Sequence, residues 1–277
     1  MSNKPEIYFH VGLGKVASTY LQHRFFPKLQ GIQYIPSNKY RHYQKHIDKS
    51  TAQRILLSRE FDNQLEYEVS RFAKLYPDAH IIIAFRRQDA WIASQYRRYV
   101  KNGGYRSFSD FIDVEKDEGL WKQHQVYMMP KIQIIEKYFH QKPLVLLHDD
   151  LKTNAFAFFN QIATYTNSTY EQAAISLAPV HKSYTEKQLK FIRKVARQLF
   201  EEPKGVHRIK PETGLRHWLH RRSKMLACYA TMYSSQLFPE HWAGTAALIA
   251  PEELEKVRAF YAKDWAEVLA YAKQHKV

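Results

Sequence analysis

The segment Ile7–Gln22 contains the residue types of an anion-binding turn. A β-branched and aromatic run is followed by Gly12 and Gly14, which permit a tight turn, and Ser18 can begin the next helix. The N–H groups in the first turn of a helix have no partner within the helix, so they bind anions together with the helix dipole. The dipole adds only about 0.3–1 kcal/mol for an exposed charge. Lys15 supplies the cation that a strong site needs.

A second group of residues favours a ligand site over an ordinary glycine turn with an incidental lysine. Arg86 directly follows the apolar run His80–Phe85, and Ser94 falls in the second turn of the helix expected at Asp89–Lys101. Ligands of open α/β sheets bind outside the carboxyl ends of the strands, so we expect Lys15, Arg86 and Ser94 at one edge. A guanidinium group offers paired donors, which with a hydroxyl suit a phosphate monoester.

The two segments together resemble the sulfotransferases that use 3′-phosphoadenosine 5′-phosphosulfate (PAPS). In that family a Lys-Ser-Gly-Thr-Thr-like loop binds the 5′-phosphosulfate, and an arginine with a serine eight positions later binds the 3′-phosphate. Lys15–Thr19 aligns with the loop, and Arg86 and Ser94 have the required spacing. Ser107–Ile112 and Leu144–Thr166 are similar to the bacterial branch that acts on carbohydrates and glycolipids. The resemblance implies that PAPS is bound by Gly14, Lys15, Val16, Ala17, Ser18, Thr19, Arg86 and Ser94.

The sequence departs from the family pattern in two places. Ala17 replaces the usual glycine of the loop, which could tighten the loop around the phosphate. The Arg-Lys-Gly loop of the animal cytosolic branch is missing. Lys204-Gly205 and His181-Lys182 are weak substitutes for it, and we carry neither over. Part of the 3′-phosphate site and the adenine site therefore remain unassigned.

Transfer to an acceptor hydroxyl needs a base, and two residues are candidates for this catalytic role beside Lys15. Glu60 follows the apolar strand at Arg54–Ser58, and Ser58-Arg59-Glu60 is similar to a Ser-Ser-Glu-like sequence common in the bacterial branch. His10 is the rival, but it falls inside the first strand, where a histidine more often serves the core or supports the loop.

By the resemblance, Lys15 contacts the oxygen that bridges sulfur and phosphorus. No metal is required, and the paired histidines at His42/His46 and His217/His220 lack acidic or cysteine company.

The elements that must position these residues alternate between strands and helices. Four strand-like runs are expected at Ile7–Val11, Arg54–Ser58, His80–Phe85 and Leu144–His148, and helical periodicity lies between them. Continuous apolar runs are typical of parallel strands that are covered on both faces. We predict an α/β fold with a central parallel sheet flanked by helices, and the resemblance implies a P-loop nucleotide-hydrolase-like topology. One domain is expected over 1–277, with a nucleotide-binding core in 1–150 and a mainly helical acceptor side in 151–277.

The composition limits the location and the partners of the protein. The chain has 277 residues, a net charge of +15 and a single cysteine, Cys228. One cysteine fits a reducing compartment, no apolar run approaches the roughly 20 residues of a membrane helix, and the N-terminal sequence has no signal-peptide pattern. We expect a cytoplasmic protein. The basic stretch 203–224, with Trp218 and Leu219 interleaved, is either a solvated loop or a peripheral contact with a membrane or an anionic acceptor.

Three functions remain at this stage. The first is a sulfotransferase that moves the sulfuryl group of PAPS to a hydroxyl of a saccharide or glycolipid. The second is a small-molecule kinase that uses ATP and Mg²⁺, for which Asp149 and Asp150 are the only candidate metal ligands. The third is a nucleic-acid-binding protein, but no recognised motif accompanies the basic charge, so we expect no nucleic acid partner. The acceptor, the sulfated position and the oligomeric state are left open.

Overall fold

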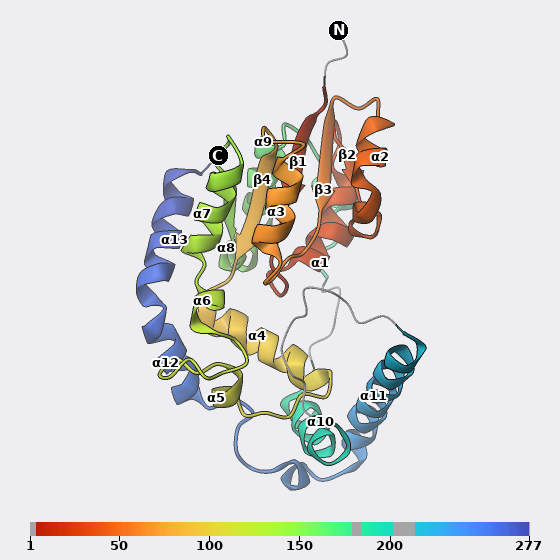
Figure 1. Ribbon diagram of the computed structural model, residues 1–277, viewed down its shortest axis with the longest axis vertical. Helices are drawn as coiled ribbons and strands as arrows, with labels where there is room; N and C mark the ends of the chain where they lie inside the picture. The colour runs from red at the N-terminus through yellow and green to blue at the C-terminus, as the bar shows by residue number, and fades with distance from the viewer. Residues whose placement is uncertain (1–3, 179–183, 202–213, 277) are drawn as a thin grey trace. The chain divides into compact units, whose positions relative to one another are not determined.

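A computed structural model of the chain describes residues 4–178, 184–201 and 214–276 (Figure 1). The chain forms two compact units. The first comprises residues 1–87, 128–181 and 263–277, and the second comprises residues 88–127 and 182–262. The second unit therefore consists of two separate stretches of chain, both inserted between parts of the first.

The first unit is built on a parallel sheet of five strands in the order β2-β3-β1-β4-β5. The strands are β1 (Glu6–His10), β2 (Gln33–Ile35), β3 (Arg54–Ser58), β4 (His80–Phe85) and β5 (Leu144–Leu147). This confirms the predicted central parallel sheet, and the four strands expected from apolar runs are all present. The edge strand β2 was not predicted, because three residues carry too little of an apolar pattern to be recognised.

Alternate residues of β1 face different helical layers. Phe9 contacts Phe72 of α3 (Leu65–Ala73) with ring centroids 4.4 Å apart. His10 points to the opposite face, where it contacts Phe26. The helical run that follows the loop covers this second face together with α9 (Ala155–Tyr165), since Phe25 stacks on Phe159 at 4.5 Å. Figure 1 shows α3 and α7 (Met129–Tyr138) on one side of the sheet and α9 on the other.

The remaining helical segments of the first unit connect or cover these layers. The loop after β1 leads into α1 (Ser18–Tyr20), the π-helical turn η1 (Leu21–Phe25) and the 3-10 turn η2 (Phe26–Lys28). The others are η3 (Ser37–His42), α2 (Tyr43–Asp48), α8 (His148–Thr153), η4 (Gln172–Ala174) and α13 (Ala262–Gln274). Asn154 caps α9 by accepting a hydrogen bond from the N–H of Ala157, as its residue type favours.

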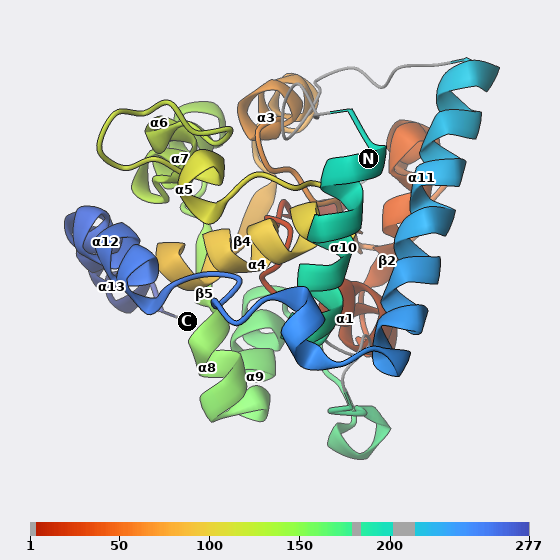
Figure 2. The same ribbon diagram turned by 90° about the horizontal axis from the view of Figure 1, so that it is seen from below.

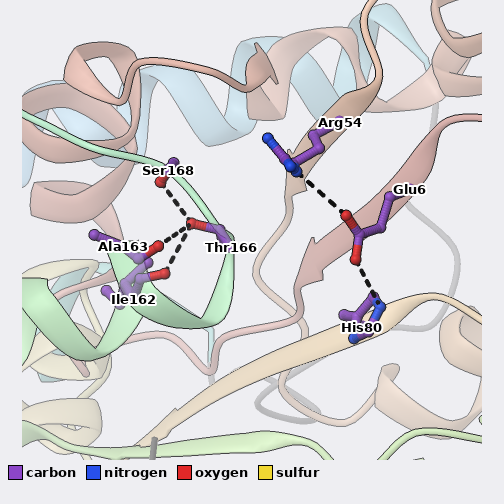
Figure 3. Close-up of polar contacts among 7 residues, drawn as sticks. All are labelled: Glu6, Arg54, His80, Ile162, Ala163, Thr166 and Ser168. Atoms are coloured by element: carbon purple, nitrogen blue, oxygen red, sulfur yellow. Dashed lines mark hydrogen bonds and ion pairs between the residues drawn. The ribbon is translucent and has the colours of Figure 1, made fainter.

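Polar contacts of Glu6 join three strands at the amino end of the sheet, opposite to the loop that follows β1. Glu6 of β1 contacts Arg54 of β3 at 3.4 Å and His80 of β4 at 3.3 Å (Figure 3). The same figure shows Thr166, whose hydroxyl donates to the carbonyl of Ile162 at 2.8 Å and closes the end of α9. Exposed pairs of this kind contribute about 0–1 kcal/mol each, so they align the strands more than they stabilise them.

The elements of the second unit are helices joined by loops, and one loop carries an isolated bridge between Ile112 and Trp121. Its helices are α4 (Gln88–Lys101), α5 (Phe108–Phe111), α6 (Gln123–Val126), α10 (Glu186–Leu199), α11 (Leu215–Ser234) and α12 (Pro251–Phe260), with 3-10 turns η5 (Ser235–Leu237) and η6 (Glu240–Ala243). Helices α10 and α11 run side by side (Figure 2). Thr185 caps α10 in a capping box with Gln188.

Candidate functional site

The pairing of β1 with β3 continues past the ends of both strands. His10 lies opposite Ser58 in the parallel register. Beyond it, the N–H of Arg59 donates to the carbonyl of His10 and the N–H of Phe61 donates to the carbonyl of Gly12, both at 2.9 Å. Side chains of an extended segment alternate between the two faces, so the next polar residues of this segment face the same side as His10.

Two carboxylates on this extension reach the loop after β1. The hydroxyl of Thr19 donates to Oε1 of Glu60 at 3.5 Å, which is at the long limit of a hydrogen bond. The N–H of Gly14 donates to Oδ1 of Asp62 at 2.9 Å. The predicted residue Glu60 is thus brought to the loop. Asp62 was not predicted, although its spacing of two from Glu60 along an extended segment could have indicated the shared face.

The loop backbone is held in an unusual conformation. Lys15 and Ala17 both have φ of 70°, in the left-handed region that favours glycine. Such residues cost of order 1–3 kcal/mol each and persist only where the surroundings impose them. The position where the resembled family has glycine is therefore a left-handed position in this chain, and Ala17 carries strain that glycine would not. Ser18 is buried, and its hydroxyl closes the turn by donating to the carbonyl of Leu13 at 2.9 Å.

Gly12 is required by a close approach of side chains. A Cβ atom at this position would lie 2.5 Å from Oγ of Ser18 and 2.6 Å from Nε2 of His10. Both neighbours are almost fully buried and have no space to withdraw. The glycine thus lets the loop pass directly over the imidazole ring of the last residue of β1.

His10 is a buried neutral histidine with one ring nitrogen directed at the loop. Its Nδ1 lies 2.8 Å from Oγ of Ser58, which also accepts a hydrogen bond from the side-chain amide of Gln22 at 3.0 Å. This contact fits either tautomer, since Oγ of Ser58 can donate to Nδ1 or accept from it, and the other ring nitrogen is Nε2. This atom makes no hydrogen bond to the described residues. Burial lowers the pKa of His10 to about 3, so the ring is uncharged at neutral pH and is a weak base.

Arg86 and His148 follow the next two strands on the same edge. Arg86 comes directly after β4, and His148 follows β5 at the start of α8. Burial, followed by the positive charges of Arg86 and Lys152, lowers the pKa of His148 to about 4. His148 was not predicted. Lys15, Glu60, Arg86 and His148 thus follow four adjacent strands at the carboxyl edge of one sheet. Ser94 lies in α4 of the second unit, and its approach to Arg86 stays a prediction.

The residues present fit a phosphate-bearing co-substrate. No hydrogen bond within the described residues uses the N–H groups of Val16, Ala17 or Ser18. Lys15 is exposed beside them, and Nε2 of His10 is buried next to Gly12 of the same loop. The α-helical segment that follows has three residues and continues directly into the turns η1 and η2. The N–H groups and Lys15 are thus the groups of this loop that could hold an anion.

The described residues contain no group of three or more His, Cys, Asp or Glu side chains that could hold a metal ion. Asp149, one of the two candidate magnesium ligands of a kinase, is exposed and pairs with Lys152 at 3.3 Å.

Within the part of the chain that is described, no helix is both long and apolar enough to cross a membrane. The weak candidates His181-Lys182 and Lys204-Gly205, and residues 203–213 of the basic stretch, lie outside the described residues.

Comparison with known proteins supports the fold. No family model matches the sequence, and no curated protein matches it. Among solved structures, the chain is similar to a sulfotransferase from Alicyclobacillus acidocaldarius, with a TM-score of 0.50 and 15% identity over 69% of this chain and 92% of that chain. It also matches the mouse sulfotransferase SULT7A1 complexed with PAP, with a TM-score of 0.45 and 11% identity over 98% of this chain and 89% of that chain. The likeness to the first of these structures shows a sulfotransferase-like fold.

Proposed function

We propose that this protein transfers the sulfuryl group of PAPS to a hydroxyl group of an acceptor, a saccharide or glycolipid. One observation carries the proposal: Lys15, Glu60 and Arg86 follow the adjacent strands β1, β3 and β4, and so lie along the carboxyl edge of one sheet. A cation at the loop, a carboxylate and a second cation are what transfer from a nucleotide with two separate phosphate groups needs.

Each residue has a separate task in this proposal. The N–H groups of Val16–Ser18 and the hydroxyl of Thr19 hold the 5′-phosphate, and Arg86 with Ser94 holds the 3′-phosphate. PAPS supplies the activated sulfuryl group. Lys15 places its ammonium group on the oxygen between sulfur and phosphorus, and it stabilises the negative charge that this oxygen gains as its bond to sulfur breaks. By analogy with phosphoryl transfer, positioning and charge stabilisation provide most of the rate enhancement.

Glu60 is the proposed base. It accepts the proton of the acceptor hydroxyl while the oxygen forms its bond to sulfur. Its carboxylate lies beside Thr19 of the loop and is partly exposed, so an acceptor can reach it. His10 is a poor alternative, because its pKa of about 3 makes it a weak proton acceptor and it is fully buried. We propose instead that His10 supports the loop, and that its ring carries the proton on Nε2 when an anion is bound above it.

The test compares Glu60→Gln with a matched control, Glu66→Gln. Glu66 is an exposed glutamate of α3 that pairs with Lys137 at 3.3 Å. General-base catalysis contributes about 10²–10⁴-fold, so Glu60→Gln should lower turnover with PAPS by that factor while its affinity for adenosine 3′,5′-bisphosphate (PAP) changes less than about threefold. The control should retain both. Near-normal turnover of Glu60→Gln would remove this residue from the mechanism.

Nucleotide binding distinguishes the sulfotransferase from a kinase. The proposal predicts that PAP binds in the presence of a metal chelator and that Lys15→Ala weakens this binding. Binding of ATP that depends on Mg²⁺, with no affinity for PAP, would refute the proposal and favour the kinase. The cytoplasmic location stays a prediction, which fractionation of the producing cells can check.

A further inference from the structure

A cavity of about 680 Å³ lies in the second unit. Three elements of this unit form its walls: the segment 105–110 before and within α5, the exposed side of α10, and η6. Its volume lies within the range of about 300–1,000 Å³ that is typical of ligand sites. Every residue that lines it belongs to the second unit, whereas the loop, Glu60 and Arg86 belong to the first.

The cavity is strongly basic. Its charged lining comprises Arg106, Lys190, Arg193, Lys194 and Arg197, against a single carboxylate, Asp110. Lysine and arginine residues at positions 190, 193, 194 and 197 of α10 recur with a spacing of three and four, so they share one face of the helix. A cavity with a large excess of one charge concentrates ligands of the opposite charge.

Two of the lysines build the wall of the cavity. The ammonium group of Lys194 donates to the carbonyl of Trp242 at 3.0 Å, and that of Lys190 donates to the carbonyl of Gly244 at 3.4 Å. Lys190 also pairs with Glu186 at 3.1 Å. These bonds fasten η6 to α10, so the two lysines have a structural task, and Arg193 and Arg197 of the same helix face are the cations that we consider for ligand binding.

The two arginines of α10 differ in how firmly they are held. The guanidinium group of Arg193 donates to the hydroxyl of Tyr96 at 3.1 Å, and this hydroxyl donates to the carbonyl of Arg106 at 2.8 Å. Tyr96 is buried, so Arg193 is positioned in advance. Arg197, one turn further along, is exposed and makes no hydrogen bond or ion pair with the described residues. It is therefore ready to pair with an anionic group of a ligand.

The other walls add groups that suit a ligand with hydroxyls and rings. Asp110 is fixed by the hydroxyl of Ser107 at 2.6 Å, and its carboxylate can accept further hydrogen bonds from hydroxyl groups. Trp242 is half exposed, and Phe238 stacks against it at 5.3 Å with an angle of 19° between the rings. A supported indole ring offers a flat apolar face to the ring of a sugar.

We infer that this cavity binds an acidic oligosaccharide, which bears carboxylate or sulfate groups. Its acidic groups pair with Arg193 and Arg197, its hydroxyls donate to Asp110, and one sugar ring packs on Trp242. Binding by the cavity does not depend on sulfuryl transfer. We also infer that such a saccharide is the acceptor of the sulfuryl group, and this second inference rests on the proposed function.

A nucleic acid fits these features less well. Proteins that bind single strands combine a basic groove along the backbone with several stacking aromatic residues. Trp242 is the one tryptophan that lines this cavity, so the lining does not offer a row of large stacking rings along a strand. Nucleic acid is therefore an outcome that the experiment must be able to reveal.

The experiment is isothermal titration of the full chain with oligosaccharides of defined length. A hyaluronan tetrasaccharide is the acidic probe, and maltotetraose is the neutral probe of equal length. Charge-assisted hydrogen bonds contribute about 1.5–3 kcal/mol, which corresponds to about tenfold or more in affinity. We expect the acidic probe to bind at least about tenfold more tightly than the neutral probe.

Variants locate the binding site. Arg197→Ala and Trp242→Ala should each weaken binding of the acidic probe by about fivefold or more. Arg221→Ala is the matched control, because Arg221 is an exposed arginine of α11 outside the cavity lining, and it should change affinity less than about twofold. All three variants should bind PAP as the unaltered chain does. A result that refutes saccharide binding in the cavity is therefore distinguishable from a result that refutes the proposed function.

Three results would overturn the inference. The first is equal loss of affinity in Arg197→Ala and Arg221→Ala, which would indicate attraction by the overall charge alone. The second is no measurable binding of the acidic probe. The third is binding of a short oligothymidylate more tightly than the tetrasaccharide with the same sensitivity to Arg197→Ala, which would assign the cavity to nucleic acid.

Discussion

Replacement of the buried histidine below the loop should alter the acid stability of the protein in a defined pH range. Burial lowers the pKa of His10 to about 3 in the folded chain, whereas an exposed histidine has a pKa of about 6.5. Between these values the unfolded chain binds a proton that the folded chain does not. The stability contributed by the neutral ring is therefore fully present above pH 6.5, and it is lost progressively as the pH falls toward 3.

The size of this loss follows from the same shift. Each pH unit inside the range costs about 1.4 kcal/mol. The two units from pH 6.5 to 4.5 should therefore lower the free energy of unfolding by up to about 3 kcal/mol through His10 alone. His10→Gln removes the titrating group and keeps a polar side chain, so this part of the pH dependence should disappear.

The assay is urea unfolding of the unaltered chain and of His10→Gln at several pH values between 7 and 4.5. The substitution also changes the free energy of unfolding by an amount that does not depend on pH. This amount cancels when each protein is compared with itself at pH 7. His148, whose pKa of about 4 is also lowered, titrates in both proteins and cancels as well. The unaltered chain should lose up to about 3 kcal/mol more than the variant. Parallel curves would refute the reasoning, because they would mean that His10 takes up its proton equally in both states.

Two further predictions concern the conformation of the loop. Ala17→Gly should raise the free energy of unfolding by about 1 kcal/mol, since glycine adopts φ of 70° without the strain that alanine carries. Ala266→Gly, an exposed position inside α13, is the control and should lower it by about 1 kcal/mol in the same urea titration. If both substitutions changed the free energy of unfolding in the same direction, the left-handed conformation of Ala17 would be contradicted. Gly12→Ala should destabilise the chain by about 1–3 kcal/mol, because the new Cβ overlaps Ser18 and His10. A well-folded Gly12→Ala that binds PAP normally would contradict the close packing described for the loop.

The sequence by itself determined the local elements of this protein. The apolar runs predicted β1, β3, β4 and β5, because strands covered on both faces need apolar residues at nearly every position. The glycines and the short polar residues after β1 predicted the turn, and Arg86 was placed correctly at a strand end. These are properties of neighbouring residues, so they can be read along the chain.

The tertiary structure alone decided which distant residues meet. The strand order brings β3 next to β1, and the register places Ser58 against His10, 48 residues earlier. No local pattern specifies such a pairing, because it depends on how the whole sheet is assembled. The contact of Asp62 with Gly14 and the neutral state of His10 follow from it. The sequence thus predicted an anion-binding loop, and the sheet determined that the carboxylates of Glu60 and Asp62 and a buried imidazole lie beside it.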